Sequence, residues 1–241
     1  MRDALRHAVA EFIGIYALVF VGSAALIVSR TGANVNLIEI ALAHGLALAV
    51  MVTATMRISG HLNPAVTVGF LAARRITPMM AGVYVAAQLL GAMAAAYTLR
   101  SVFPVSEFVA ARGGGQAVAS GVSSGSAYLL EAIATFFLTF VVFGTAVDPH
   151  APKVGGLAIG LTVAADILAI GPLTGASMNP ARSFGPAVAS GVYEGQVIYW
   201  VGPILGSVAA ALLYDTLFLR RGKEPVLHGP IDPDPERHHR H

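Results

Sequence analysis

The 241-residue chain contains no cysteine, a single tryptophan and few charged residues. Without cysteine it can form no disulfide framework, no thiolate metal site and no thiol nucleophile. Only 12% of its residues are charged, whereas soluble domains carry about 25%. The formal net charge of +2 gives no basis for a nucleic-acid partner. Because 56% of the residues are hydrophobic and the mean hydropathy is +0.70, the composition predicts an integral membrane protein.

Six apolar stretches are long enough to cross a bilayer. A helix rises about 1.5 Å per residue, so a hydrocarbon core about 30 Å thick requires roughly 20 residues. The stretches are Ala8–Val28, Leu37–Met56, Met80–Leu99, Ala127–Ala146, Val154–Ile170 and Val197–Leu219. The first follows Met1–Arg6 without a small-residue cleavage site, so we expect a retained span rather than a signal peptide.

Two further apolar segments, Pro64–Ala73 and Pro180–Ser190, are too short to span. At ten or so residues each would reach only about 15 Å. Free backbone groups in lipid cost several kcal/mol, so half-length helices must end inside protein or beside a water-filled cavity. The sequence therefore predicts an all-α membrane protein with six transmembrane helices and two re-entrant half-helices.

The distribution of Lys and Arg predicts the orientation in the membrane. Most of these residues fall on one side of the expected spans: Arg2, Arg6, Arg57, Arg74, Arg75, Lys153, Arg220, Arg221 and Lys223. The opposite side has Arg30, Arg100 and Arg112. By the positive-inside rule we expect both termini to be cytoplasmic. The absence of cysteine, the short loops and the lack of a targeting sequence favour a bacterial plasma (inner) membrane.

The C-terminal tail, residues 221–241, is rich in proline, histidine and charge. We expect it to be a disordered cytoplasmic segment, because it has too few apolar residues to bury. Its His238, His239 and His241 are interpreted as solvated side chains rather than a metal site.

The chain repeats itself within residues 1–220. Three motifs recur in the same order and at a nearly constant offset. The first set is Ala10-Glu11-Phe12, His61–Val66 and Gln88–Gly91, and the second is Leu130-Glu131-Ala132, Ser177–Arg182 and Pro203–Gly206. Each repeat, about 5–100 and 126–220, holds three spans. Because three is odd, the second repeat enters from the opposite side, and the functional site is expected near the bilayer midplane.

The central motifs of the repeats are Asn63-Pro64-Ala65 and Asn179-Pro180-Ala181. Asparagine is a favoured N-cap and proline a favoured first helical residue, so each motif opens a half-helix. One such motif alone would indicate a capped turn. Two inverted copies bring two amide NH₂ donors and two helix N-termini, each with roughly half a positive charge, to one place. That arrangement favours a neutral hydrogen-bond acceptor such as water and excludes cations and protons.

With these motifs the chain closely resembles the aquaporin, or major intrinsic protein, family over about residues 5–220. The resemblance implies one pore per subunit, a homotetramer in the lipid bilayer, passage of water and small neutral solutes, and no cofactor. An enzyme is not expected, because the sequence offers no nucleophile–base pair or metal cluster. A secondary transporter, a glycerol facilitator with low water flux and a non-conducting membrane scaffold are the alternatives.

The resemblance also implies a selectivity ring. Arg182 directly follows the second motif and matches the arginine of the family's ring, while Ile167 and Ala176 match two further positions. The fourth position is His44 if the span itself is aligned, or Ala43 if one counts back from Asn63. We choose His44, because an indel is easier in a loop than in a packed helix. This ring is similar to those of tonoplast intrinsic and ammonia-conducting aquaporins, so we expect passage of ammonia, hydrogen peroxide or small polyols beside water.

Other residues are expected to support the pore. Glu11 and Glu131 occupy equivalent positions and, by the resemblance, accept hydrogen bonds from the re-entrant loops. His61 either supports its loop or lines the vestibule. The residues after the second motif, Ser183 and Ala187, and later Tyr199-Trp200, resemble water channels rather than glycerol facilitators.

Overall fold

The computed structural model describes residues 2–31, 33–152 and 154–219, and the regular elements in these ranges are all helices. The long helices are α1 (Arg2–Val28), α2 (Leu37–Thr55), α4 (Pro78–Val102), α6 (Ser124–Val142), α7 (Gly155–Thr174) and α9 (Gln196–Tyr214). The short ones are α3 (Pro64–Ala72), α5 (Val105–Ala110), η1 (Arg112–Gly114), α8 (Pro180–Ser190) and the π-helical turns η2 (Phe143–Val147) and η3 (Asp215–Leu219). The expected tail 221–241, with its histidines, lies outside the described residues.

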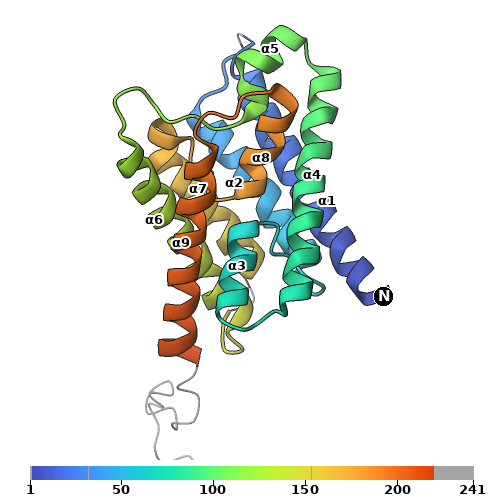
Figure 1. Ribbon diagram of the computed structural model, residues 1–241, viewed down its shortest axis with the longest axis vertical. Coiled ribbons are helices and arrows are strands. Elements are labelled where there is room, and N and C mark those ends of the chain that lie inside the picture. Colours follow the sequence, from blue (N-terminus) through green and yellow to red (C-terminus); the bar gives the residue numbers. More distant parts are fainter. Residues whose placement is uncertain (1, 32, 153, 220–241) are drawn as a thin grey trace, which may run out of the picture.

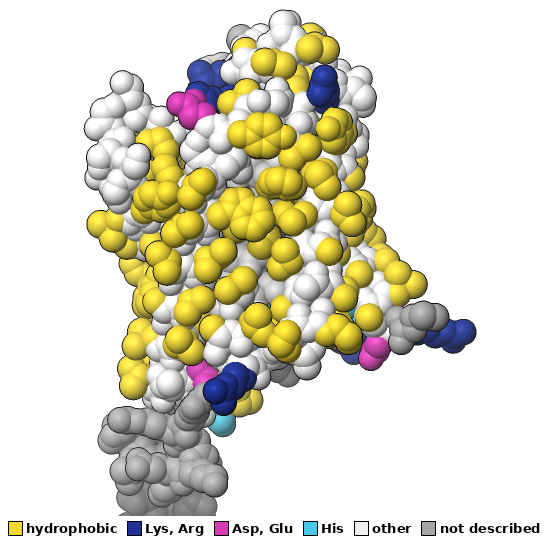
Figure 2. All heavy atoms as spheres, in the orientation of Figure 1, with side chains coloured by type: hydrophobic (Ala, Val, Ile, Leu, Met, Phe, Trp, Pro, Cys, Tyr) yellow, Lys and Arg dark blue, Asp and Glu magenta, His cyan; other side chains and the backbone are white. Residues whose placement is uncertain are grey.

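Six helices are long and apolar enough to cross a membrane, which confirms the six predicted spans. They form a bundle in which the start of α1 and the end of η3 lie on one side, here called the terminal face, while α5 lies on the opposite side (Figure 1). On the surface shown in Figure 2, hydrophobic side chains cover the middle of the bundle and charged side chains lie near its two ends. This is the surface that a lipid bilayer requires.

The two half-helices α3 and α8 complete the fold. They begin directly after Asn63 and Asn179 and stop after two to three turns, as the sequence predicted. α3 packs against α9, and α8 packs against α4, so each half-helix is held by a helix of the other repeat. Within the first repeat α1 packs on α4, and in the same way α6 packs on α9 within the second. The two repeats meet where α2 packs on α7. The packing therefore follows the internal repeat of the sequence.

Glycine permits the closest helix contacts. A Cβ atom placed on Gly206 of α9 would lie 1.9 Å from the carbonyl oxygen of Ala132 in α6. A Cβ atom on Gly160 of α7 would lie 2.2 Å from the carbonyl oxygen of Gly45 in α2. In lipid, helix association depends on such close backbone packing because there is no hydrophobic driving force between helices.

Two details of the fold differ from the sequence-based expectation. α1 begins at Arg2 and α7 continues through Pro172 to Thr174, because helices extend beyond the apolar segment that hydropathy detects. The short helix α5 and the turn η1, between α4 and α6, were not predicted, since they have neither the length nor the apolar composition of a span.

Candidate functional site

The site begins with the two capped half-helices. Asn63 and Asn179 are the N-cap residues of α3 and α8, each in an extended backbone conformation with proline following. The side-chain oxygen of Asn63 accepts a hydrogen bond from the Ala65 amide at 2.9 Å, and that of Asn179 accepts from the Ala181 amide at 3.0 Å. These bonds satisfy helix N–H groups that have no partner within the helix and fix the direction of each amide nitrogen.

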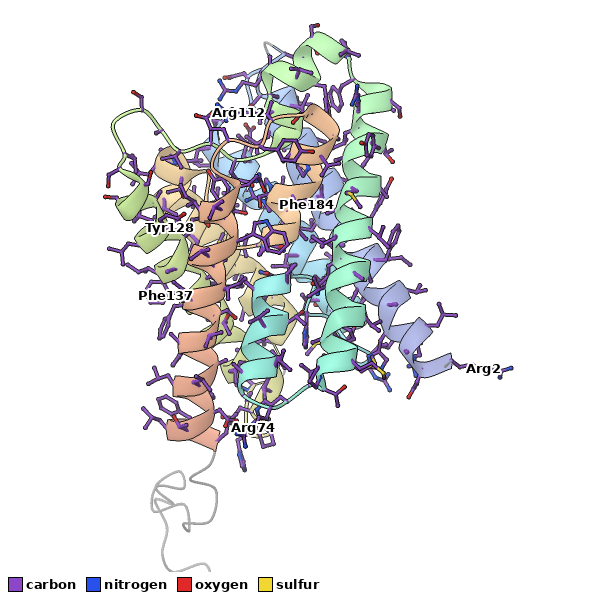
Figure 3. The ribbon with its side chains drawn as sticks, viewed as in Figure 1. Arg2, Arg74, Arg112, Tyr128, Phe137 and Phe184 are labelled. Carbon is purple, nitrogen blue, oxygen red and sulfur yellow. The ribbon has the colours of Figure 1, made fainter. Side chains whose placement is uncertain are left out.

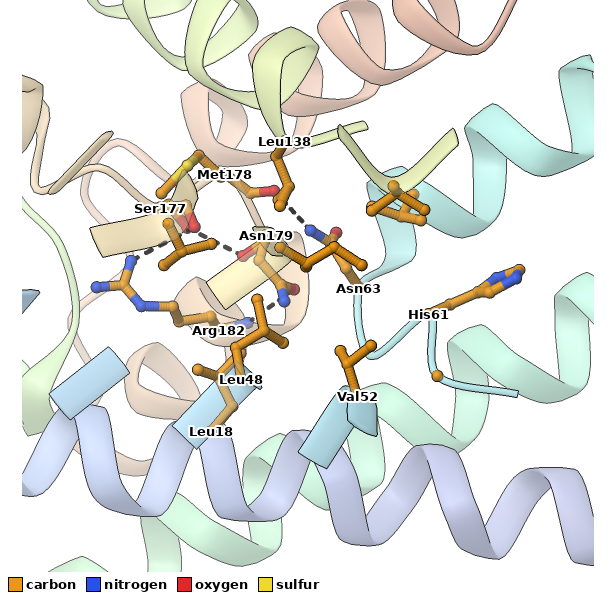
Figure 4. Close-up of a pocket in the computed structure, with 15 residues that line it drawn as sticks. Leu18, Leu48, Val52, His61, Asn63, Leu138, Ser177, Met178, Asn179 and Arg182 are labelled. Carbon is orange, nitrogen blue, oxygen red and sulfur yellow. Dashed lines mark hydrogen bonds between the residues drawn. The ribbon is translucent and has the colours of Figure 1, made fainter. Parts of the chain in front are cut away.

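The two caps are also bonded to each other's loops. The Nδ2 of Asn63 donates to the Met178 carbonyl, and the Nδ2 of Asn179 donates to the Leu62 carbonyl, both at 2.8 Å. Leu62 and Met178 adopt positive φ angles of 49° and 54°, which are uncommon for residues other than glycine. Each NH₂ group keeps a second hydrogen, and both asparagines line one cavity (Figure 4).

Two buried carboxylates hold the strained loops in place. Glu11 of α1, fully buried, accepts hydrogen bonds from the backbone amides of Gly60, His61 and Leu62 and from the side chain of Gln88. Glu131 of α6, also fully buried, accepts from the amides of Ser177 and Met178 and from the hydroxyl of Thr174. A buried charge needs such partners, and both acids here receive them from the loops that precede the caps.

Two cavities lie beside this site, and Arg182 lines both of them. The central cavity is lined by Asn63, Asn179, His61 and Arg182, with an apolar wall that includes Leu18, Leu48, Val52, Leu138, Val142, Ile159 and Val163. The second cavity lies towards the α5 side and is lined by Arg30, Arg112, Gln116, Ile167 and Arg182, among others. Arg182 is therefore the charged side chain between the two cavities, and it is only 2% exposed.

The Arg182 guanidinium is fixed by three acceptors. Its Nη1 donates to the Ala176 carbonyl at 2.8 Å and to the Ser177 carbonyl at 3.4 Å. Its Nη2 lies 2.9 Å from Nε2 of His44, whose Nδ1 lies 2.8 Å from the Ile40 carbonyl. Because a carbonyl only accepts, Nδ1 of His44 carries the proton and Nε2 accepts from Arg182. His44 is therefore neutral, and the Nε of Arg182 keeps a hydrogen with no protein partner among the described residues.

The four residues of the predicted ring lie close together, but only two of them line a cavity. Arg182 and Ile167 line the second cavity. Ala176 is fully buried and contributes its carbonyl to Arg182. His44 lines neither cavity. Its ring lies between Arg182 and Gly22 of α1, where a Cβ atom would come within 2.2 Å of the imidazole. Ala43, the other register considered, is partly exposed, whereas His44 is buried.

His61 lies at the terminal-face end of the central cavity. Its Nδ1 is 3.1 Å from the Thr67 hydroxyl, which itself donates to the Asn63 carbonyl at 3.0 Å. The ring centroid lies 4.2 Å from that of Phe70 and 5.0 Å from that of Tyr84. His61 thus contacts Thr67 of α3 and also lines the central cavity. The sequence analysis named support of the loop and lining of the vestibule as its two alternatives.

Gln116 was missed by the sequence reasoning. Its side chain is only 6% exposed, lines the second cavity, and has neither amide atom bonded to a described protein group. Gln116 packs on Gly175, where an added Cβ atom would lie 2.7 Å from the Cβ of Gln116. Gly175 directly precedes Ala176, whose carbonyl accepts the hydrogen bond from Arg182. An amide directly after Gly113–Gly115 in a loop was the available signal. Within the described ranges, no group of three or more His, Asp or Glu side chains could hold a metal ion.

Comparison with known proteins identifies the family. The model of the major intrinsic protein family matches residues 1–214. The chain is a member of the major intrinsic protein, or aquaporin, family. Aquaporins are channels for water and small solutes across membranes, not enzymes.

Curated relatives match this aquaporin over nearly its whole length. Aquaporin TIP4-4 of Zea mays is 45% identical, over 92% of this chain and 90% of its own. Probable aquaporin TIP3-2 of Arabidopsis thaliana is 41% identical, over 96% and 90%. Aquaporin TIP2-1 of Arabidopsis thaliana is 43% identical, over 90% and 88%. Among solved structures, that of the aquaglyceroporin from Plasmodium falciparum matches with a TM-score of 0.79 and 25% identity, covering 91% of this chain and 99% of that one. The predicted family and fold are confirmed.

The expected location is wrong. The relatives are tonoplast intrinsic aquaporins of plants, which contradicts the expectation of a bacterial plasma membrane. The absence of cysteine and the short loops are properties of the chain itself. They do not distinguish one cellular membrane from another. What stands is a multi-pass membrane protein.

Proposed function

We propose that this aquaporin conducts water passively through the two joined cavities, past the paired asparagines and Arg182. The observation that carries this proposal is the reciprocal bonding of Asn63 and Asn179 beside a cavity with apolar walls. Each amide is fixed, keeps one hydrogen for a passing molecule and lies at a helix N-terminus with partial positive charge. A molecule with a lone pair is bound there, whereas a cation is repelled.

In this proposal Arg182, Ile167 and Ala176 form the selectivity ring, and His44 belongs to it as the residue that holds Arg182. Neutral His44 accepts from the guanidinium, so the positive charge of Arg182 stays at the junction of the cavities. Glu11 and Glu131 hold the two loops, and His61 lines the terminal-face end. Ile and Ala in the ring leave it less narrow than aromatic residues would, which supports passage of ammonia, hydrogen peroxide or small polyols beside water.

Glycerol is the second candidate solute. The solved structure that matches this fold is titled an aquaglyceroporin, and 91% of this chain follows it. Against glycerol as the main solute stand the relatives named as TIP aquaporins and the hydrogen bonds that keep Arg182 within the passage.

We further propose that residues 1–220 form one channel domain made of the repeats 5–100 and 126–220. Four copies would assemble in the bilayer with one pore each. The exposed apolar side chains on the bundle, including Leu42, Leu46 and Val50 of α2 and Leu157 and Leu161 of α7, give both lipid and neighbouring copies a surface to contact.

Stopped-flow light scattering on proteoliposomes tests the proposal, with water, glycerol and ammonia compared side by side. We expect water permeability several-fold above that of protein-free vesicles. Val163→Phe enlarges a side chain in the central cavity and should lower this flux, whereas Val197→Phe, on a residue that is 64% exposed on α9, should not. Water flux equal to that of empty vesicles would favour a membrane scaffold. Flux that saturates and follows an ion gradient would favour a transporter.

A further inference from the structure

A groove on the terminal face lies outside the proposed passage. One face of the first turns of α1 forms one side of the groove. Thr55 at the end of α2 and Ile58 in the turn after it form the other side. Its apolar floor comes from residues at helical spacing, Leu5, Val9 and Ile13, which are 64%, 47% and 50% exposed. The groove thus runs along the membrane-spanning direction of α1.

Two guanidinium groups lie at the end of this groove. Arg2 and Arg6 line it and are one helical turn apart, at the point where α1 leaves the apolar part of the bundle. Figure 3 shows Arg2 at the free end of α1, directed away from the bundle. In the part of the chain that the structure describes, the Arg/Lys ion pairs are Arg75–Asp215 and Arg112–Glu194, so neither Arg2 nor Arg6 has an acidic partner there.

The chemistry of the groove selects among three occupants. The chain's own segment 220–241 holds four acidic and five basic residues, so it offers no charge complementarity. A second copy would have to bring an acid to the level of Arg2 and Arg6. Among the acids that the structure describes on the terminal face, Asp148 and Asp215 are already hydrogen-bonded to Tyr214 and Arg75, which leaves Asp3, itself beside Arg2 in the sequence. A phospholipid with an anionic headgroup matches both features at once, because its acyl chain is apolar and its phosphate carries the opposite charge.

We propose that this α1–α2 groove binds an anionic phospholipid from the leaflet on the terminal face. The acyl chain lies along Leu5, Val9 and Ile13, and the headgroup receives hydrogen bonds from the guanidiniums of Arg2 and Arg6. Arginine forms paired N–H···O bonds with phosphate oxygens, and each basic residue near a membrane surface strengthens binding to anionic lipid. The site anchors the start of α1, which the His7–Tyr84 hydrogen bond ties to α4.

Native mass spectrometry of the purified full-length chain in detergent tests this site, with phosphatidylglycerol and phosphatidylcholine of identical acyl chains as probes. For the wild-type chain we expect phosphatidylglycerol to be preferred by roughly thirtyfold, given about 1 kcal/mol for each of the two arginines at a membrane surface. Arg6→Gln should lower the preference about fivefold, since it removes one of the two charges. The double variant R2Q/R6Q should abolish it.

Two further variants separate this site from general surface charge. Arg74→Gln removes an exposed terminal-face arginine outside the groove and should leave the preference unchanged. Ile13→Trp fills the floor with both arginines intact and should lower retention of both lipids. Equal binding of the two lipids by the wild-type chain would overturn the proposal, as would equal losses in R6Q and R74Q. A third overturning result is an unchanged lipid preference in R2Q/R6Q with loss of the oligomer by light scattering, which would assign the groove to protein–protein contact.

Discussion

The side-chain amide of Asn179 donates a hydrogen bond to the backbone carbonyl of Leu62, 2.8 Å away and 117 positions earlier in the chain. The reciprocal bond runs from Asn63 to Met178. Each asparagine therefore caps its own half-helix with the oxygen of its amide and fixes the opposite loop with the nitrogen. The two half-helices depend on each other for the direction of the donors that face the cavity.

This double role predicts that Asn179→Ala is more damaging than loss of an ordinary cap. Losing a cap costs about 1 kcal/mol, and losing a buried hydrogen bond about 1 kcal/mol more. Asn36→Ala is the matched control, because Asn36 caps α2 through Ile38 and Glu39 but makes no bond to another loop within the described ranges. Free energies of unfolding from SDS titration in mixed micelles should differ by about 1 kcal/mol between the variants. Equal losses would mean that the cross-loop bond adds no stability.

Much of this site could be read from the sequence, but its bonding could not. The Asn-Pro-Ala motifs fixed where α3 and α8 begin, because N-cap and first-turn preferences are local. The acceptors Leu62 O and Met178 O could not be foreseen, since they are exposed to the opposite asparagine only when both residues adopt positive φ. Such conformations are rare outside glycine and arise here from the buried Glu11 and Glu131, which are far away in the chain.

The same distinction applies to the spans and to Gln116. Hydropathy located six helices because lipid demands about twenty apolar residues, but it cannot report the polar ends of α1 or the continuation of α7 through Pro172. The position of Gln116 depends on how the α5–α6 connection folds over Gly175. No periodicity encodes that path, so a polar residue in a loop gave little signal until its surroundings were known.

Helix packing leads to a second prediction, at Gly206. A methyl group there would lie 1.9 Å from the Ala132 carbonyl, and two helix backbones would have to separate to accept it. We expect Gly206→Ala to destabilise the protein by about 1–3 kcal/mol through overpacking. Gly82→Ala in α4 is the control, since nothing lies within 4 Å of its added methyl group. It should be neutral or stabilising by up to about 1 kcal/mol, because alanine is the better helix former. Thermal unfolding in detergent measures the stability of both variants. Similar melting temperatures would contradict the close approach of Gly206 to the Ala132 carbonyl.

The contact between His44 and Arg182 leads to a third prediction, on selectivity. His44→Ala removes the acceptor of Nη2 and opens the volume of an imidazole behind the guanidinium, next to Gly22. We expect glycerol permeability to rise several-fold relative to water, with little change in folding. Ala43→Val alters the neighbouring residue, which is the alternative register, and should leave the ratio unchanged. Stopped-flow measurements of water and glycerol permeability in the two variants test this prediction. A changed ratio in the Ala43 variant with none in His44→Ala would assign the ring to the other register.

Arg182 itself leads to the last prediction. It is the charged residue common to both cavities, and a buried cation within a membrane protein is costly unless it serves a function. Arg182→Val should widen the junction, raise glycerol permeability several-fold and permit a proton leak, because only the partial charges of the helix N-termini then oppose cations. Arg100→Val is matched to it, since Arg100 also donates to a backbone carbonyl, that of Ala189 at 2.7 Å, but lines neither cavity. A pH-sensitive dye inside the vesicles, under an imposed membrane potential, reports the leak. If Arg182→Val and Arg100→Val exclude protons and glycerol equally well, the guanidinium holds its loop in place and does not select the solute.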